Sequence, residues 1–229
     1  MFFNSTYLIY MIPAFILMSI TSWYVKRNYN KWSQVRASSG LTGAQAAQRL
    51  ISTGGLYGVN VQGTAGHLTD HYDPRNKTLF LSQGVANVPS VASVAIAAHE
   101  LGHALQDAED YFPLRLRATL VPIVNIGSNL GWILIMIGLM LRFTELAWLG
   151  ILVFSGGALF ALATLPVEFN ASARAKELLV QTGIIQSEEE RRGVNAVLNA
   201  AALTYVAGLV TAVMQLLYYI SLVGGGRRR

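Results

Sequence analysis

Long apolar runs alternate with polar stretches along the chain, and this pattern predicts where the polypeptide crosses a membrane. Each run is close to the about 20 residues that an α-helix needs to span the hydrocarbon core of a bilayer. The second, third and fourth runs contain no charged residue. We therefore predict four transmembrane helices, at roughly residues 2–25, 120–141, 146–165 and 200–223.

Two of these runs have an alternative interpretation. The first run resembles a signal peptide in position, but Lys26 and Arg27 follow it and no small-residue cleavage site precedes them. We therefore interpret it as an uncleaved anchor. The third run is short and glycine-rich, so the alternative is a buried core helix. Its uncharged length favours a membrane span.

Helix signals follow the first run. Residues 25–39 are basic and aromatic, which predicts either an amphipathic helix along the lipid headgroups or a plain continuation of the first helix into water. Thr42 is a candidate N-cap for a helix of residues 44–51, and Gly54 with Gly55 ends that helix.

Strand signals come next. Residues 73–77 are rich in turn formers and separate two short runs, which is typical of a hairpin. An alternating run precedes them. We therefore predict a small antiparallel sheet that includes a hairpin, built from residues 56–62, 67–72 and 78–81.

The polar stretch after the third run predicts two further helices. One has Pro166 near its start and ends at Thr182 and Gly183. Ser187 and Glu190 then form an S-x-x-E capping box, which predicts the start of the last long helix.

Composition agrees with a membrane protein. Charged residues make up 13% of the chain and hydrophobic residues 53%, whereas a typical soluble domain is about 25% charged. The chain has no cysteine, so disulfides are excluded and a zinc site has to use histidine and carboxylate ligands. The net charge is +5, but the basic residues cluster at the ends of apolar runs, which gives no support for nucleic-acid binding.

The basic residues also predict an orientation. Most of the 17 lysines and arginines lie between the first two runs or between the last two, whereas only Arg142 lies between the second and third. The positive-inside rule places the two basic regions in the cytoplasm and the N-terminus outside. The tail of Arg227, Arg228 and Arg229 disagrees, because four spans put it outside too; we follow the larger count.

Residues 99–103 form an H-E-x-x-H motif. They lie in a stretch that Ser90 or Ser93 can cap and that we expect to be helical to about Asp107. On a helix, His99 and His103 lie on one face, one turn apart, and can present two imidazoles to one Zn²⁺. Glu100 then lies beside the metal, where it can take a proton from water.

A catalytic zinc usually has a third protein ligand. Glu168 is the best acidic candidate, because it lies among apolar residues at the end of the third span, on the same predicted side as His99. The alternative is that the Glu168 carboxylate binds no metal and instead interacts with a helix dipole. His67 and His71 are the rival ligands.

Several segments together carry a family resemblance. The motif, two hydrophobic spans and then E-F-x-A resemble gluzincin membrane peptidases of the HtpX and CAAX-prenyl-protease type. The closer similarity is to the YugP-like family of bacterial neutral zinc metallopeptidases, over most of the chain. It rests on L-T-D-H-Y-D-P-R-N-K at residues 68–77, A-A-H-E-x-G-H-A at 97–104 and L-P-V-E-F at 165–169.

The resemblance implies one Zn²⁺ per chain, with His99, His103 and Glu168 as ligands and Glu100 as catalytic base. In the gluzincin pattern an aspartate often lies four residues after the ligand glutamate and supports a zinc histidine. This chain has Ser172 there.

Two supporting roles therefore have more than one candidate residue. Asn170 or Asp107 can take the place of the missing aspartate, beside Ser172. The donor that stabilises an oxyanion also has several candidates, namely His71, Tyr72 and Arg174.

We predict a membrane-embedded zinc endopeptidase in the bacterial inner membrane, active at the cytoplasmic surface on peptides or membrane proteins. A substrate is expected to add a strand to the sheet, at residues 67–72 or 78–81. The alternatives are a membrane scaffold with a structural zinc and a site-2-type intramembrane protease. The latter expects an Asp ligand in an N-P-D-G-like or L-D-G-like motif, which this chain lacks, and uncharged spans argue against a transporter.

The predicted fold class is a mainly α membrane protein, with about four transmembrane helices and a small cytoplasmic α+β zincin-like metallopeptidase domain that has a short antiparallel sheet. The predicted parts are an anchor (1–25), the cytoplasmic domain with the motif helix (26–117), a transmembrane hairpin (118–166), cytoplasmic helices that complete the metal site (167–199), a C-terminal transmembrane helix (200–223) and a basic tail (224–229).

Overall fold

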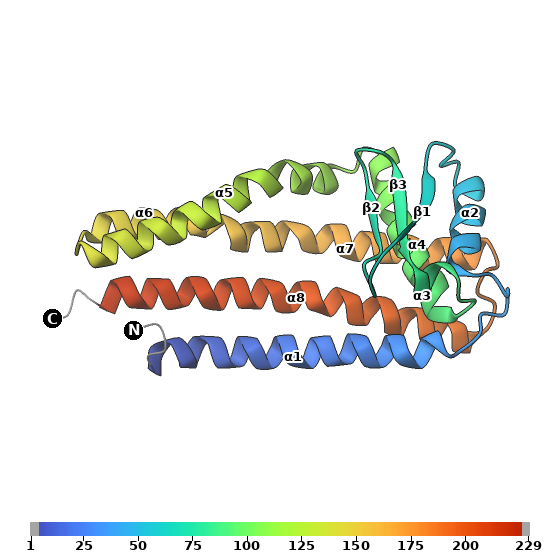
Figure 1. Cartoon of the computed structure of the whole chain (residues 1–229), viewed down its shortest axis with the longest axis horizontal. Coiled ribbons are helices and arrows are strands. Elements are labelled where there is room, and N and C mark those ends of the chain that lie inside the picture. Colours follow the sequence, from blue (N-terminus) through green and yellow to red (C-terminus); the bar gives the residue numbers. More distant parts are fainter. Residues whose placement is uncertain (1–4, 226–229) are drawn as a thin grey trace. The chain divides into compact units, whose positions relative to one another are not determined.

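The computed structural model describes residues 5–225, which are mainly helical with one small sheet (Figure 1). The elements, in chain order, are α1 (Ser5–Ser33), α2 (Gly43–Thr53), β1 (Asn60–Thr64), β2 (His71–Asp73), β3 (Thr78–Ser82), α3 (Gln83–Ala86), α4 (Val91–Ala108), α5 (Phe112–Met140), α6 (Thr144–Phe154), α7 (Gly156–Gln181) and α8 (Glu188–Gly225).

The described residues form two compact units. The helical unit contains residues 5–21, 115–165 and 204–225, and the sheet unit contains residues 22–114 and 166–203. Helices α1, α5, α7 and α8 contribute to both units. The motif and every candidate site residue lie in the sheet unit.

Four helical stretches are long and apolar enough to cross a membrane, which confirms the four predicted candidates: Ser5–Ser33, Phe112–Met140, Thr144–Gln181 and Glu188–Gly225. A helix suits the bilayer because it satisfies every backbone hydrogen bond within itself. Large side chains of the third stretch are exposed, such as Leu152 and Leu159, so this stretch is not a buried core helix. Residues 2–4 of the first predicted run and Arg227–Arg229 of the tail lie outside the described residues.

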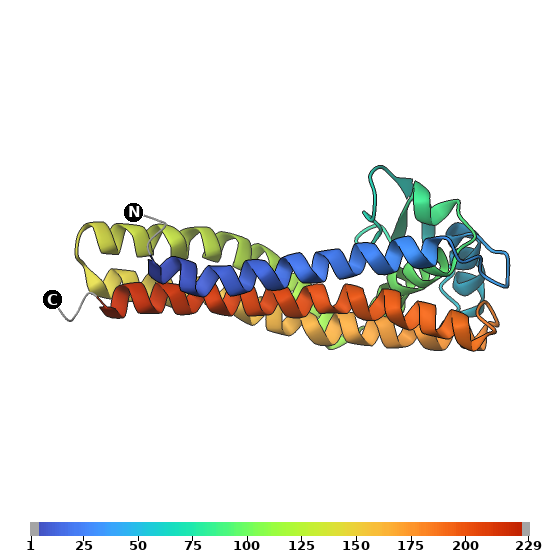
Figure 2. The same cartoon turned by 90° about the horizontal axis from the view of Figure 1, so that it is seen from below.

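Small residues let α5 and α6 approach closely within the helical unit, and the two helices lie side by side in both views (Figures 1 and 2). A Cβ built on Gly131 would lie 2.8 Å from the carbonyl oxygen of Gly150, and one on Gly138 would lie 2.5 Å from the backbone nitrogen of Ala147. Such contacts between small residues are typical of helix packing in membranes.

The structure decides between the two interpretations of the segment after the first run, and it corrects one predicted helix start. Helix α1 continues without interruption to Ser33, so residues 25–33 continue the first helix. Pro166 lies inside α7 and does not start a helix, so that prediction was wrong. Proline lacks an N–H group, but membrane helices tolerate this loss because nearby groups satisfy the freed carbonyl. Glu168 is consequently carried by the same helix as the third apolar run.

The sheet is mixed, whereas an antiparallel sheet was predicted. Its strand order is β1-β3-β2, with β2 antiparallel and β1 parallel to β3. The hairpin of β2 and β3 is therefore confirmed, and the wholly antiparallel sheet was wrong. Alternation along a strand shows which side chains are buried but carries no information about strand direction. Strand β3 is central, so residues 78–81 are not an edge.

The predicted caps are present. Thr42 and Gln45 form a reciprocal capping box at α2, and Ser90 accepts a hydrogen bond from the Ser93 N–H at the start of α4. Ser187 and Glu190 likewise bond each other's backbone N–H groups at α8. Each cap satisfies N–H groups that lack a partner in the first helical turn.

The core of the sheet unit positions α4. The largest fully buried residues include Leu50 of α2, Leu79 and Leu81 of β3, and Leu101 of α4. They belong to one hydrophobic cluster, together with the buried alanines of α4. Alanine permits close contact and favours helix, so α4 is held on several sides.

Candidate metal centre

Helices α4 and α7 bring three potential metal ligands together. His99 and His103 lie one turn apart on α4, and Glu168 lies on α7. Gly102 lies between the histidines in sequence, and a Cβ there would come within 2.5 Å of the carbonyl oxygen of Ala171. The absence of a side chain at Gly102 therefore allows the backbones of α4 and α7 to meet at this point.

The three side chains converge on one small volume. The Glu168 Oε2 atom lies 3.3 Å from His99 Nε2 and 3.6 Å from His103 Nε2. One ligand atom from each residue lies within 4.8 Å of the others. The Glu168 side chain is 2% exposed and each histidine side chain 12% exposed. A carboxylate buried to this degree requires positive charge beside it.

The donor set fits zinc. Two atoms that each lie about 2.0–2.1 Å from a tetrahedral ion are about 3.4 Å apart, and the two nitrogen–oxygen distances are 3.3 and 3.6 Å. Two imidazoles and one carboxylate are also the ligand types of a common catalytic zinc site.

The rival ligands lie elsewhere. Within residues 5–225, neither His67 nor His71 belongs to the group that could hold a metal. The ring of His67 packs edge-on against Tyr29, with 5.0 Å between the ring centroids. The ring of His71 stacks on Phe80 and its Nδ1 atom lies 2.9 Å from the carbonyl oxygen of Thr69.

Glu100 follows His99 directly on α4 and is partly buried. Burial raises the pKa of its carboxyl above the ordinary value, and the nearby imidazoles of His99 and His103 offset part of this increase. A raised pKa brings a carboxylate closer to the proton affinity that suits a base at neutral pH.

Each histidine of the group has a neutral partner at its other ring nitrogen. Ser172 Oγ, four residues after Glu168, lies 3.2 Å from His99 Nδ1. His103 Nδ1 lies 3.0 Å from the Oε1 atom of Gln106, a fully buried residue that sequence reasoning missed. The sequence feature that could have indicated Gln106 is its place on α4, three residues after His103, where a side chain can reach that histidine. Asn170 contacts Gln106.

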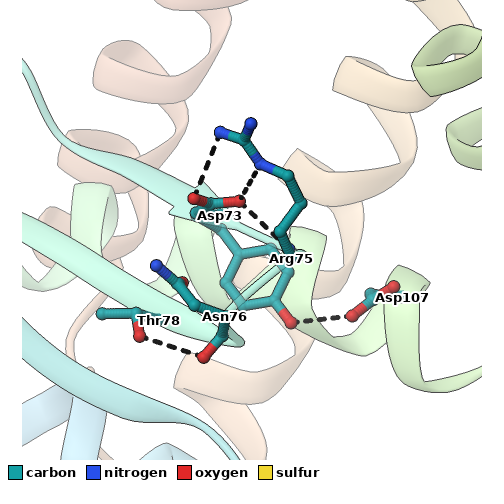
Figure 3. Close-up of polar contacts among 6 residues, drawn as sticks. Asp73, Arg75, Asn76, Thr78 and Asp107 are labelled. Carbon is teal, nitrogen blue, oxygen red and sulfur yellow. Dashed lines mark hydrogen bonds and ion pairs between the residues drawn. The ribbon is translucent and has the colours of Figure 1, made fainter.

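Tyr72, a candidate donor to the oxyanion, is hydrogen-bonded to Asp107. The Tyr72 hydroxyl donates to Asp107 Oδ2 at 2.8 Å. Figure 3 shows Asp107 near Asp73, Arg75 and Asn76, at the turn between β2 and β3. Burial raises the pKa of Tyr72, and the hydrogen bond to Asp107 adds to this. In the same turn Asp73 binds Arg75, and this exposed ion pair lowers the pKa of Asp73.

The third candidate donor, Arg174, makes two hydrogen bonds to Glu109 and one to Asn170. The interaction with Arg174 lowers the pKa of Glu109. The oxyanion role of His71, Tyr72 or Arg174 therefore stays a prediction, since each side chain already has a partner in the structure.

Comparison with known proteins places this geometry in a family. The family described as "Putative neutral zinc metallopeptidase" matches residues 7–224. The chain belongs to this metallopeptidase family. The relative described as "Putative membrane protease YugP", from Bacillus subtilis (strain 168), is 46% identical over 203 residues, which are 89% of this chain and 90% of the relative. No solved structure matches the chain.

Membership of the family agrees with two features of the structure. The family is named for zinc, and the chain brings together His99, His103 and Glu168. The relative is named a membrane protease, and four helices of this chain are apolar and long enough to span a bilayer. These observations together indicate a membrane protein.

The close contact at Gly102 leads to a first prediction. Gly102→Ala is expected to lower the free energy of unfolding by about 1–3 kcal/mol, because the new Cβ overlaps the α7 backbone. It is also expected to weaken zinc binding, since Glu168 moves with α7. Thermal melting of the metal-free protein and zinc affinity by chelator competition measure the two effects.

Gly208→Ala is the matched control. A Cβ at Gly208 has nothing within 4 Å, so this change reports the gain in helix propensity alone, about 1 kcal/mol. If Gly102→Ala melts at the temperature of Gly208→Ala and binds zinc equally well, the close contact has no role in the site.

Proposed function

We propose that this chain is a zinc-dependent membrane endopeptidase whose active centre lies at the cytoplasmic surface of the bacterial inner membrane. The observation that carries the proposal is the convergence of His99, His103 and Glu168 beside Glu100. The family match supports a metallopeptidase, and the named relative supports a protease of the membrane.

His99 and His103 would hold the zinc through Nε2, and Glu168 would hold it through a carboxylate oxygen. When bound, zinc supplies a Lewis acid that makes water more acidic and polarises the carbonyl of the substrate. Within the described residues, the group contains three ligands. Three protein ligands are typical of a catalytic zinc, whereas a structural zinc usually has four. This count favours an enzyme over a scaffold.

Glu100 would perform the proton transfers. Its carboxylate accepts a proton from water while the water oxygen forms a bond to the carbonyl carbon of the peptide. The protonated carboxyl then donates this proton to the amide nitrogen as the carbon–nitrogen bond breaks. The products are a carboxylic acid and an amine, and the carboxylate of Glu100 is restored.

Strand β2 is the edge at which we place the substrate. It is an outer strand of the sheet, and its residue Tyr72 contacts Asp107 of α4, the helix that carries the motif. An extended peptide can add to such an edge through main-chain hydrogen bonds, with weak demands on its side chains. Peptides and juxtamembrane segments of membrane proteins fit this mode.

Metal removal tests the proposal. The purified full chain in lipid nanodiscs is expected to contain about one zinc per chain and to cleave an unstructured protein such as casein. A zinc chelator should abolish cleavage, and one equivalent of zinc should restore it, whereas magnesium should not. Mass spectrometry for zinc and product sequencing are the measurements.

Two results would overturn the proposal. A chain that binds no zinc at micromolar concentration contradicts the metal site. A chain that holds zinc but cleaves none of a broad peptide library behaves as the scaffold with a structural zinc.

A further inference from the structure

Gln106 is a fully buried polar residue beside the proposed metal centre. Its Nε2 atom donates to the carbonyl oxygen of Val167 at 2.8 Å and to Asn170 Oδ1 at 2.9 Å. Its Oε1 atom lies 3.0 Å from His103 Nδ1. One side chain of α4 therefore contacts His103 on its own helix and makes two hydrogen bonds to the part of α7 that carries Glu168.

These partners determine the direction of the hydrogen bonds. A backbone carbonyl can only accept, so the amide nitrogen of Gln106 must face Val167. The amide oxygen then faces His103 and can itself only accept, so the proton of a neutral His103 is on Nδ1. The unprotonated nitrogen is Nε2, the atom that lies 3.6 Å from Glu168 Oε2.

An ion pair anchors the far side of this network. Asn170 Oδ1 also accepts a hydrogen bond from Arg174 Nε at 2.7 Å. Arg174 in turn donates twice to Glu109, at 2.8 and 2.7 Å. Two donors thus point at Asn170 Oδ1, which keeps the Asn170 amide from turning over.

The other histidine lacks such a constraint. Ser172 Oγ lies 3.2 Å from His99 Nδ1, and a hydroxyl can either donate or accept. Ser172 therefore supports His99 without determining where its proton lies. The network of Gln106 acts on His103 alone.

We propose that Gln106 is a positioning residue, which holds the proton of His103 on Nδ1 and directs Nε2 toward the metal. The inference rests on the proposed zinc site. A histidine that binds a metal usually donates its other N–H to a carboxylate, a backbone carbonyl or water. In this chain a side-chain amide takes that place, oriented by two acceptors on α7.

The test compares zinc affinity, by chelator competition, among variants of the full chain in nanodiscs. Gln106→Met keeps the approximate length and removes the hydrogen bonds, and we expect it to weaken zinc binding about 10–100-fold. Gln106→Glu should also weaken binding, because the oxygen that replaces Nε2 faces the acceptor oxygens of Val167 and Asn170. Gln181→Met, on the exposed end of α7, is the matched control and should bind zinc as wild type does.

The glutamate variant separates the proposal from a simpler idea. If the partner of His103 needs only to be basic, Gln106→Glu should bind zinc more tightly than wild type, and that result overturns the proposal. Equal zinc affinity of Gln106→Met and wild type overturns it too. Neither result affects the proposed function, which fails instead if wild type itself binds no zinc.

Two changes at Asn170 protect the test against a misfolded Gln106 variant. Asn170→Asp keeps an acceptor for Gln106 and Arg174 and should bind zinc within a few-fold of wild type. Asn170→Leu removes that acceptor and should weaken binding toward the level of Gln106→Met. Equal affinities of the two, in proteins that melt normally without metal, contradict the network.

Discussion

Glu100→Gln is expected to lower the rate of peptide cleavage about 10²–10⁴-fold, the range for loss of a general acid–base group, while the protein still binds zinc. Glutamine has nearly the shape of glutamate but cannot take a proton from water. Glu100 is not among the three converging ligands, so its charge is not required to hold the ion. Zinc content and cleavage rate are measured on the same preparation.

Glu189→Gln is the control, since this glutamate is exposed in the first turn of α8. It should leave both cleavage and zinc content unchanged. Cleavage that persists in Glu100→Gln at the wild-type rate would remove Glu100 from the mechanism. Zinc lost together with cleavage would instead make Glu100 a part of the metal site.

Glu168→Ala should weaken zinc binding by more than about 100-fold, the upper end of what loss of an outer hydrogen-bond partner costs. The change removes the one carboxylate of the converging group and leaves two imidazoles. Isothermal titration of the metal-free protein with zinc measures the affinity. Cleavage at low zinc concentration should fall with it.

Glu177→Ala lies on the same helix and is exposed, so it controls for changes in helix propensity and net charge. It should bind zinc as wild type does. Unchanged zinc affinity in Glu168→Ala would contradict the proposed ligand set and return attention to His67 and His71. We do not expect that result, because the ring of His67 packs on Tyr29 and the ring of His71 packs on Phe80.

Much of the fold is encoded locally and could be predicted. The four apolar stretches follow from length and composition, because about 20 uncharged residues suffice to cross a bilayer. The caps at Thr42, Ser90 and Ser187 depend on residues only three positions apart. Such signals need no knowledge of the rest of the chain.

The errors have a common physical origin. The direction of β1 and the continuity of α7 through Pro166 depend on packing between distant segments. Strand alternation does not encode parallel pairing, and a proline can start a helix or lie within one. Local sequence leaves both choices open.

The sequence by itself determined the helical pair of His99 and His103, with Glu100 beside them, because the spacing of an α-helix places them on one face. It also narrowed the third ligand to Glu168 or a histidine. Only the tertiary structure showed that Glu168 approaches both imidazoles and that Gln106 connects His103 to α7. The reason is distance along the chain: 61 residues separate Gln106 from Val167, and contacts across such a separation arise from packing of α4 on α7.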